Sequence, residues 1–541
     1  MNVLAILLSA FVVAIIGLMF YIWSQRKSLL DGGQQAARVI FEDGGVGTIE
    51  EPALTPAARA ALQAHMDSDG LVHAAPDPAE LDARVAADRS SARVTLTFFS
   101  IAIIWLLLAS AFGLVSSIKL HAPDWLVDSQ WLTFGITRTL HLNIVAYGWA
   151  PMVALGVCNW LLPRLLKTPL VGGSYALLGA LIWNVALASG LIGIANGYNT
   201  GLEWLEIPLP IAGWLAVGGA LIGLPLVVTL QRRKVDHLYV SVWYMGAALF
   251  WFPTLLILAK LPVHQGIEQA TTNWWFGHNV LGLFYTPLSL ATVYYLLPKI
   301  IGRPVESYNL SLVGFWTLAF FYGQVGGHHL IGGPVPGWLI ALSIVQSMMM
   351  IIPVAAFTIN QHKTLSGHFS ALIHSPTLRF VVLGGMMYTL SSVQGSLEAL
   401  RSINTVTHFT HFTVAHAHLG LYGFVTLVMF GAIYFITPRI TGWEWPYPKL
   451  IAVHFWLVVG GFGIYFVMLT WAGWMQGMYM LDAARPFMDS VKVTQPGLIG
   501  RSIGGAIMTL GHFVLAGHFL LMVLRAGPKR EAPPLLHQKT A

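Results

Sequence analysis

Long apolar runs dominate the chain and alternate with short polar intervals. Thirteen of them reach the roughly 20 residues that a helix needs to cross a bilayer. They occupy residues 2–24, 95–117, 137–163, 173–195, 209–230, 239–261, 276–298, 308–331, 337–358, 377–400, 411–436, 450–472 and 500–524. Backbone groups inside lipid must be satisfied internally, so runs of this length predict transmembrane helices. We therefore expect an all-α polytopic membrane protein.

The polar intervals between the runs alternate in charge. Lys and Arg concentrate in every second loop, as in "RLLK" (164–167) and "QRRK" (231–234), and again in the tail "RAGPKRE" (525–531). The intervening loops, such as "NGYNTGLEWLE", carry almost none. Cationic loops face the cytoplasm. We expect the N-terminus on the periplasmic side and the C-terminus in the cytoplasm.

This pattern divides the chain into four parts: a transmembrane anchor at 1–24, a polar cytoplasmic insert at 25–92, a twelve-helix core at 93–525 and a cytoplasmic tail at 526–541. The first run lacks a basic leading segment and a small-residue cleavage site, which favours a retained anchor over a signal peptide. The insert is rich in Ala, Asp and Glu, and a short helix is expected at 56–66. We expect its charges to form a solvated surface.

Composition strengthens the membrane assignment. Of 541 residues, 56% are hydrophobic and 10% charged, and the mean hydropathy is +0.68; soluble proteins carry about 25% charged residues. The net charge of +6 is explained by the cationic loops, so it does not indicate nucleic acid. The single cysteine, Cys158, excludes an internal disulfide, a cysteine zinc site, an iron–sulfur cluster and a CxxCH haem attachment.

Histidines inside the apolar runs are the chemical feature of this sequence, because ionisable groups in lipid are rare and usually functional. Six of them, on four runs, form the set of interest: His141, His278, His328, His329, His416 and His418. Successive helical residues turn by about 100°, so His416 and His418 point to nearly opposite sides of one helix. Two ligands of one metal would instead lie on one face, four residues apart. This pair therefore requires two separate partners.

The remaining histidines suggest what these partners are. His278, His328 and His329 can converge on one transition metal if their helices are neighbours and the helix of the adjacent pair is distorted, which its glycines 323, 326 and 327 permit. Imidazole ligation suits copper, zinc or iron. His141 and one member of the 416/418 pair can hold a bis-histidine haem, and the other member can hold a second haem with an open side.

This constellation resembles subunit I of the haem–copper oxidase superfamily, and within it the cbb3-type cytochrome oxidases. The motifs "GITRTLH", "FGHN", "YGQVGGHH" and "VTHFTHFTVAHAHLG" follow in the family's order across residues 95–525. The resemblance implies a twelve-helix core in a bacterial inner membrane, with two haems and one copper ion. It also implies four-electron reduction of O2 to water, coupled to proton uptake and translocation.

Residue by residue, the resemblance assigns the ligands. It implies that His141 and His418 ligate a low-spin haem b, that His416 ligates a high-spin haem, and that copper is bound opposite it by His278, His328 and His329. Tyr322, six residues before His328, stands where the family has a redox tyrosine that is cross-linked to a copper ligand. An ordinary buried tyrosine is the alternative interpretation.

Further positions match the family less specifically. Hydroxyls of a proton path are expected at Thr286, Tyr295, Ser311 and Tyr388, although such groups often only bond to backbone. Arg138 and His408 are expected near the haem propionates, with interfacial snorkelling as the alternative for the arginine. Glu203 and Glu206 resemble a site for Ca2+, which prefers carboxylate oxygens.

The sequence departs from the family at one position. Gln394 stands where the family has a glutamate near the proximal haem ligand. An amide accepts the N–H of the proximal imidazole without bringing charge, so the histidine is a less basic ligand. We therefore expect a raised haem potential. Glu398, one helical turn on, can restore the charge.

Two other functions compete with the oxidase. Nitric oxide reductases of the same superfamily lack the tyrosine, carry extra glutamates on the "FGHN" helix and use non-haem iron. Here "WWFGHNVLGLFYTPLSL" holds no glutamate. A non-enzymatic transporter with intramembrane histidines is the second alternative. Without a CxxCH motif the oxidase needs a partner subunit that carries haem c or another electron carrier.

Overall fold

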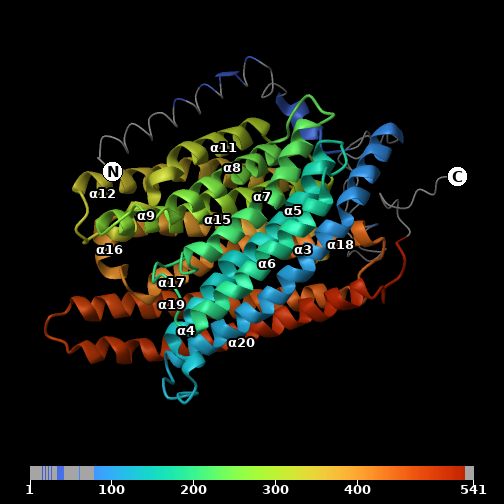
Figure 1. Cartoon of the computed structure of the whole chain (residues 1–541). Helices are drawn as coiled ribbons and strands as arrows, with labels where there is room; N and C mark the ends of the chain where they lie inside the picture. The colour runs from blue at the N-terminus through green and yellow to red at the C-terminus, as the bar shows by residue number, and fades with distance from the viewer. Residues whose placement is uncertain are drawn as a thin grey trace.

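The structure, a computed structural model, describes residues 33–41 and 78–530, together with six single residues: Ile15, Met19, Ile22, Trp23, Arg26 and Ala60. The described part is helical and forms one bundle of long, tilted helices (Figure 1). The expected anchor at 2–24 and the short helix at 56–66 lie outside the described residues, apart from those single positions.

The first half of the bundle runs through α3 (Pro78–Lys119), α4 (Phe134–Ile144), α5 (Ala150–Leu165), α6 (Gly173–Ala195), α7 (Leu209–Gln231), α8 (Val240–Lys260), α9 (Ile267–Val280) and α10 (Thr286–Ile301). The second half runs through α11 (Tyr308–Phe321), η5 (Tyr322–Leu330), α12 (Gly337–Met349), α13 (Ile351–Leu365), α15 (Pro376–Glu398), α16 (Arg401–Thr407), α17 (His411–His418), α18 (Leu427–Thr441), α19 (Lys449–Leu481) and α20 (Phe487–Val523). A single turn, α14 (Ala371–His374), precedes α15.

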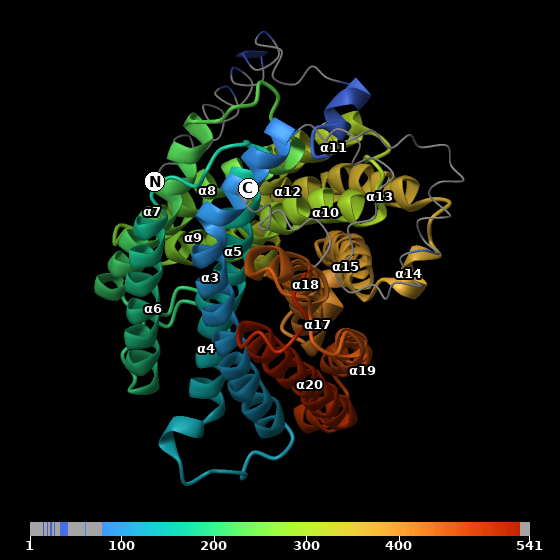
Figure 2. The same cartoon turned by 90° about the vertical axis from the view of Figure 1, so that its right-hand side faces the viewer.

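Ten helical segments of the described chain are long and apolar enough to cross a membrane. The helix α11 continued by η5, and α15, complete the twelve segments that the sequence predicts after the anchor. The segments α4–α5, α9–α10 and α17–α18 are the most buried, and α19 with α20 forms a long antiparallel hairpin on one side (Figures 1 and 2). These buried segments carry four of the six histidines.

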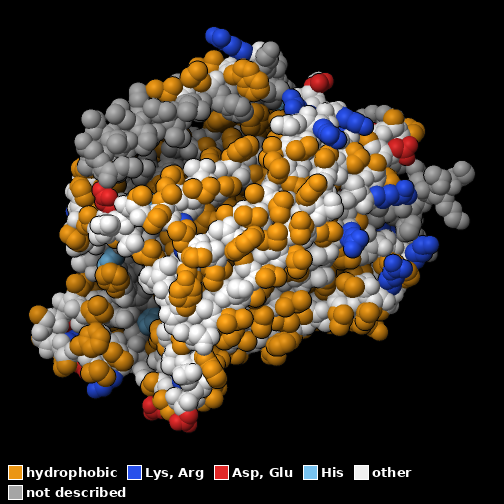
Figure 3. Space-filling view, in the orientation of Figure 1, with side chains coloured by type: hydrophobic (Ala, Val, Ile, Leu, Met, Phe, Trp, Pro, Cys, Tyr) orange, Lys and Arg blue, Asp and Glu red, His pale blue; other side chains and the backbone are white. Residues whose placement is uncertain are grey.

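The outer helices present apolar side chains, as lipid requires (Figure 3). On the face drawn there, most Lys and Arg side chains gather at the end of the bundle where α3 begins and the chain ends. The protein is a multi-pass membrane protein, as the sequence predicts.

The interpretation of the insert's charges as a solvated surface is wrong for Arg84 and Asp88, whose side chains are buried. The helix α3 begins at Pro78, well before the expected core boundary at 93, because proline suits a first helical turn and alanines follow it. Asp88 on this extension forms an ion pair of 2.8 Å with Arg164 of α5, and both side chains are fully buried. Arg84 donates to the carbonyl of Ile40 at 2.9 Å. Buried charges must be paired, and packing supplies the partners.

Candidate functional site

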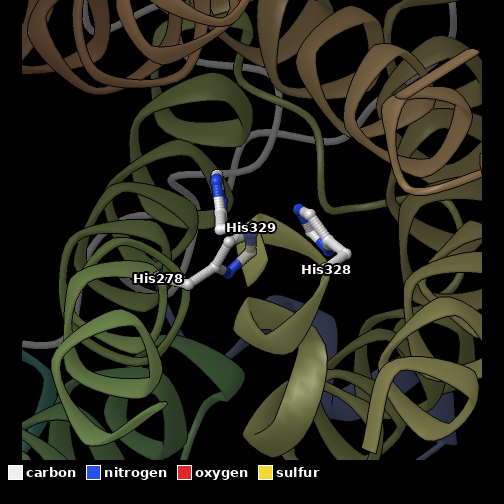
Figure 4. Close-up of side chains that lie close together, drawn as sticks. All are labelled: His278, His328 and His329. Carbon is white, nitrogen blue, oxygen red and sulfur yellow. The ribbon is translucent and has the colours of Figure 1, made fainter. Parts of the chain in front are cut away.

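Three histidines converge between α9 and η5 (Figure 4). His278 comes from α9, and His328 and His329 come from η5. One ring nitrogen of each lies within 4.8 Å of the others. The segment η5 is a 3₁₀-helix, which confirms the predicted distortion and allows two adjacent side chains to approach one point.

Small residues and serines fix this cluster. A Cβ atom at Gly326 would lie 2.7 Å from the Cβ of His278, so glycine permits the close approach of η5 to α9. The backbone N–H of His328 donates to Ser343 Oγ at 2.7 Å, and its Nδ1 lies 3.1 Å from Ser347 Oγ. Such hydrogen bonds orient a ligand imidazole.

The cluster fits a transition metal. The Nδ1 atom of His278 is buried and has no hydrogen-bond partner among the described residues. Two nitrogens bonded to one ion at about 2.0–2.1 Å lie at most about 4.2 Å apart. The observed spread of 4.8 Å therefore requires only small ring movements.

His141 and His418 face one another across the bundle. Their ring centres are 6.3 Å apart and their planes differ by 9°. Two metal–nitrogen bonds of roughly 2 Å with two ring half-widths of roughly 1 Å span about 6 Å. Each Nδ1 lies 2.8 Å from a backbone carbonyl, of Ala109 and Val414 respectively. This leaves each Nε2 as the nitrogen available to iron, and the pair fits a bis-histidine haem.

Tyr465 contacts this pair, and sequence reasoning misses it. Its hydroxyl lies 3.0 Å from Nε2 of His418, the nitrogen that iron would take, so it must withdraw when a haem is bound. Arg501 lies over the ring of Tyr465 at 5.6 Å. No spacing motif in the sequence links Tyr465 on α19 to the histidines of α17.

His416 turns away from His418 toward α15, as the two-residue spacing predicts. Its Nδ1 lies 3.3 Å from Oε1 of Gln394 and 3.6 Å from Oε2 of Glu398. A Cβ atom at position 395 would lie 2.8 Å from Cε1 of the His416 ring, so Gly395 makes room for the imidazole. The amide and the carboxylate therefore both face the nitrogen that a haem iron would leave free.

Tyr322 stands beside the three-histidine cluster. Its ring centre lies 5.2 Å from that of His278. The ring fills the space that a side chain at Gly282 would occupy, since a Cβ atom there would overlap it. Gly282 lies one helical turn after His278, so the glycine sets the approach of the tyrosine to the histidine.

A local feature missed by sequence reasoning follows three of the ligand positions. Wider π-turns span η3 (Val145–Trp149), η4 (Leu281–Tyr285) and η6 (Leu419–Thr426). They begin shortly after His141, His278 and His418. Such turns occur frequently at functional sites. A glycine inside each one, at 148, 282 and 420, is the available sequence signal.

The expected proton-path hydroxyls are only partly brought together. Tyr295 accepts a hydrogen bond of 2.7 Å from Nε of Arg164, and its ring packs on Trp160 of α5. Its neighbour Tyr294 instead stacks on Tyr244, and both hydroxyls lie against Gly314 of α11, one turn after Ser311. Adjacent helical residues point about 100° apart, so Tyr294 rather than Tyr295 faces this group.

The remaining predicted hydroxyls have different surroundings. Ser311 donates to the carbonyl of Tyr308 at 2.6 Å. The Tyr388 hydroxyl is buried with no partner among the described residues, and its ring packs on Phe357, which also contacts Tyr294. Thr286 begins α10 directly after η4. A small cavity next to Tyr294 is lined by Asn360, Gln361 and Thr364, among others.

The residues expected near the haem propionates or at a calcium site lie near the ends of the helices. Arg138 forms an ion pair with Glu203, and Glu206 accepts a hydrogen bond of 3.0 Å from Asn143. Burial raises the pKa of Glu206, which lies in the loop between α6 and α7. His408 follows α16, and its ring packs against Phe409.

Comparison with known proteins agrees with this geometry. Residues 93–507 match the family described as cytochrome c and quinol oxidase polypeptide I. The chain is 30% identical to the cbb3-type cytochrome c oxidase subunit CcoN1 of Stutzerimonas stutzeri, over 81% of this chain and 96% of that protein. It is 31% identical to cytochrome c oxidase subunit 1 of Rhodobacter capsulatus, over 71% and 76% of the two chains.

More distant relatives widen the comparison. A nitric oxide reductase subunit of Stutzerimonas stutzeri is 24% identical over 78% of this chain and 93% of its own length. A haem–copper terminal oxidase dimer solved by cryo-electron microscopy superposes with a TM-score of 0.64 at 16% identity, covering 82% of this chain and 86% of that one. The matched region contains all six of the proposed ligand histidines, from His141 to His418. The chain therefore belongs to the cytochrome c and quinol oxidase polypeptide I family, the haem–copper oxidase subunit I proteins, on its cbb3-like side.

Proposed function

We propose that this chain is the catalytic subunit of a cbb3-like terminal oxidase that reduces O2 to water and couples the reaction to proton uptake and translocation. The observation that carries the proposal is Tyr322, which lies 5.2 Å from His278 in a space that Gly282 leaves open. The similarity to the cbb3-type subunit of Stutzerimonas stutzeri supports the same class.

The histidines divide into three ligand sets. His141 and His418 would hold a low-spin haem b, and His416 would hold a high-spin b-type haem. The cluster of His278, His328 and His329 would hold copper. When bound, the high-spin haem and the copper supply a centre at which O2 takes up four electrons and four protons to give two waters. The helix that carries both His416 and His418 holds the two haem sites in fixed relation.

Hydroxyl side chains of this chain would hold and deliver protons at this centre. Tyr322 keeps a phenolic proton beside the proposed copper ligand His278. Its ring lies in the space that Gly282 leaves open, because this glycine has no side chain. The group formed by Tyr294, Ser311 and Tyr388 supports a path from the cavity beside Asn360 toward Tyr322. Thr286 and Tyr295 belong to the path only as a sequence prediction.

Partners and orientation follow the resemblance. The chain has one cysteine and no CxxCH motif, so electrons must come from a partner subunit with haem c or from another carrier. The arginine- and lysine-rich end of the bundle would face the cytoplasm of a bacterial cell. With the transmembrane anchor expected at 1–24, the N-terminus would then lie outside.

Nitric oxide reduction is the competing activity, and metal content separates the two. The purified protein should contain two iron and one copper per chain by elemental analysis. Three iron and no copper would indicate a reductase. A pyridine-haemochrome spectrum gives an independent test: a preparation without haem would refute the oxidase proposal, and a transporter would then be the better interpretation.

The proposed role of Tyr322 has a structural readout. Mass spectrometry of digested protein should reveal a cross-linked peptide that joins Tyr322 to His278. The cross-link forms one ring-to-ring bond with loss of two hydrogens, and an oxidant such as O2 takes up those hydrogens during turnover. The separate, unmodified peptides in fully active protein would exclude the cross-link.

A further inference from the structure

The loop between α6 and α7 contains Glu203 and Glu206, the two residues that the sequence suggests as ligands of Ca2+. Calcium takes six to eight oxygen ligands from carboxylates, carbonyls and water. A calcium site here would therefore need several loop oxygens that point to a common centre. The hydrogen bonds of this loop decide whether such oxygens are available.

Every backbone carbonyl from residue 203 to residue 207 already accepts a hydrogen bond from this chain. The donors are Asn273 Nδ2 to Glu203 O at 2.7 Å, Tyr147 Oη to Trp204 O at 2.5 Å, Thr200 Oγ1 to Leu205 O at 2.8 Å, Thr200 N to Glu206 O at 3.0 Å, and Lys260 Nζ to both Leu205 O and Ile207 O at 2.5 Å. A carbonyl oxygen has a second lone pair, but at Leu205 and Ile207 the donor already bound is an ammonium, whose charge repels an incoming cation.

Both carboxylates have partners of their own as well. Glu203 Oε1 is paired with the guanidinium of Arg138. Glu206 is 5% exposed, and its Oε2 accepts from Asn143 Nδ2. One oxygen of each carboxylate and all five carbonyls thus face N–H or O–H donors, and two of those donors, Arg138 and Lys260, carry positive charge. The residues present do not fit a calcium ion.

Lys260 provides a positive charge at this position. It is the last residue of α8, and its ammonium bridges the carbonyls of Leu205 and Ile207 on either side of Glu206. A lysine ammonium is a compact charge with three donors. We propose that the Lys260 ammonium is the built-in cation of this outer loop, and that the protein takes no Ca2+ there.

The loop fixed by Lys260 contacts two helices that carry proposed ligands, α4 and α9. Arg138 and Asn143 flank His141 on α4. The indole of Trp204, whose φ is 68°, comes within 3.9 Å of the Cβ position of Gly277, next to His278. Left-handed backbone is uncommon for tryptophan, and the surrounding hydrogen bonds hold it. Lys260 is thus a positioning residue for both sites, a consequence that rests on the proposed haem and copper assignments.

The first test measures calcium itself. Inductively coupled plasma mass spectrometry measures the calcium content per chain of the purified full-length protein. Its thermal unfolding is then followed with and without excess EGTA. We expect far less than one calcium per chain and the same unfolding midpoint in both conditions. One calcium per chain, removed by EGTA together with a fall in the midpoint, would overturn the proposal. This test needs no bound haem, so its result is independent of the oxidase assignment.

The second test removes the ammonium. Lys260→Met should lower the unfolding midpoint and shift the absorption spectrum of the low-spin haem, whereas Lys260→Arg should restore most of both. Lys492→Met, at an exposed lysine of α20, is the matched control and should change neither. If Lys260→Met matches the wild type in both measurements, Lys260 does not hold the loop. If Lys260→Met does not accumulate, Lys260→Arg is compared with the wild type instead. A changed haem spectrum in Lys260→Arg, together with bound calcium, would count against the proposal.

Discussion

Gly282 offers the sharpest test of how the active site is assembled. A Cβ atom at this position would lie inside the ring of Tyr322, far closer than the 3.0 Å that real Cβ atoms keep from their neighbours. In Gly282→Ala the tyrosine must therefore move by more than roughly 1 Å, and a displacement of about 1 Å at a reacting centre can cost about 100-fold in rate. We expect O2 consumption by Gly282→Ala to fall at least about 100-fold.

The assay compares O2 uptake in detergent with the haem content and with the cross-linked Tyr322–His278 peptide. Haem content should stay unchanged, because the three atoms nearest to the alanine Cβ all belong to Tyr322. The cross-linked peptide should disappear. Gly246→Ala on the neighbouring helix α8 is the control, since a Cβ atom there meets nothing within 4 Å. Near-normal O2 uptake and an intact cross-link in Gly282→Ala would refute the reasoning.

Three other substitutions test contacts elsewhere in the protein. Tyr322→Phe should abolish O2 turnover with the haems still bound, and spectra with activity assays check this; near-normal turnover would exclude a redox role. Gln394→Glu should lower the potential of the high-spin haem by roughly 40 mV, because a charged acceptor strengthens the hydrogen bond to His416 by about 1 kcal/mol; an unchanged potential in a redox titration contradicts this. Asp88→Asn should destabilise the protein by about 3–5 kcal/mol, because it removes the carboxylate facing the buried Arg164; an unaltered unfolding midpoint would argue that this ion pair contributes little.

The proton path shows what position in the sequence does and does not predict about the direction of a side chain. Matching to the family assigns Thr286, Tyr295, Ser311 and Tyr388 to the path. A shift of one residue on a helix changes the direction of a side chain by about 100°. The structure turns Tyr295 toward Arg164 and Tyr294 toward Tyr244 and α11. Which of two adjacent tyrosines faces a path depends on the rotation of α10 within the bundle, which sequence spacing alone does not fix.

The sequence by itself determined the membrane class, the twelve core segments, the six histidines and the opposite directions of His416 and His418. These properties are local: they depend on the length of apolar runs and on the 3.6-residue period of a helix. Residue geometry left open which of His416 and His418 pairs with His141, and only the family resemblance chose His418; the tertiary structure shows the two rings facing each other. Only the tertiary structure decided that Tyr465 contacts His418 and that Lys260 occupies the loop of Glu203 and Glu206. Each of these contacts joins segments far apart in the chain, and their meeting is set by how whole helices pack.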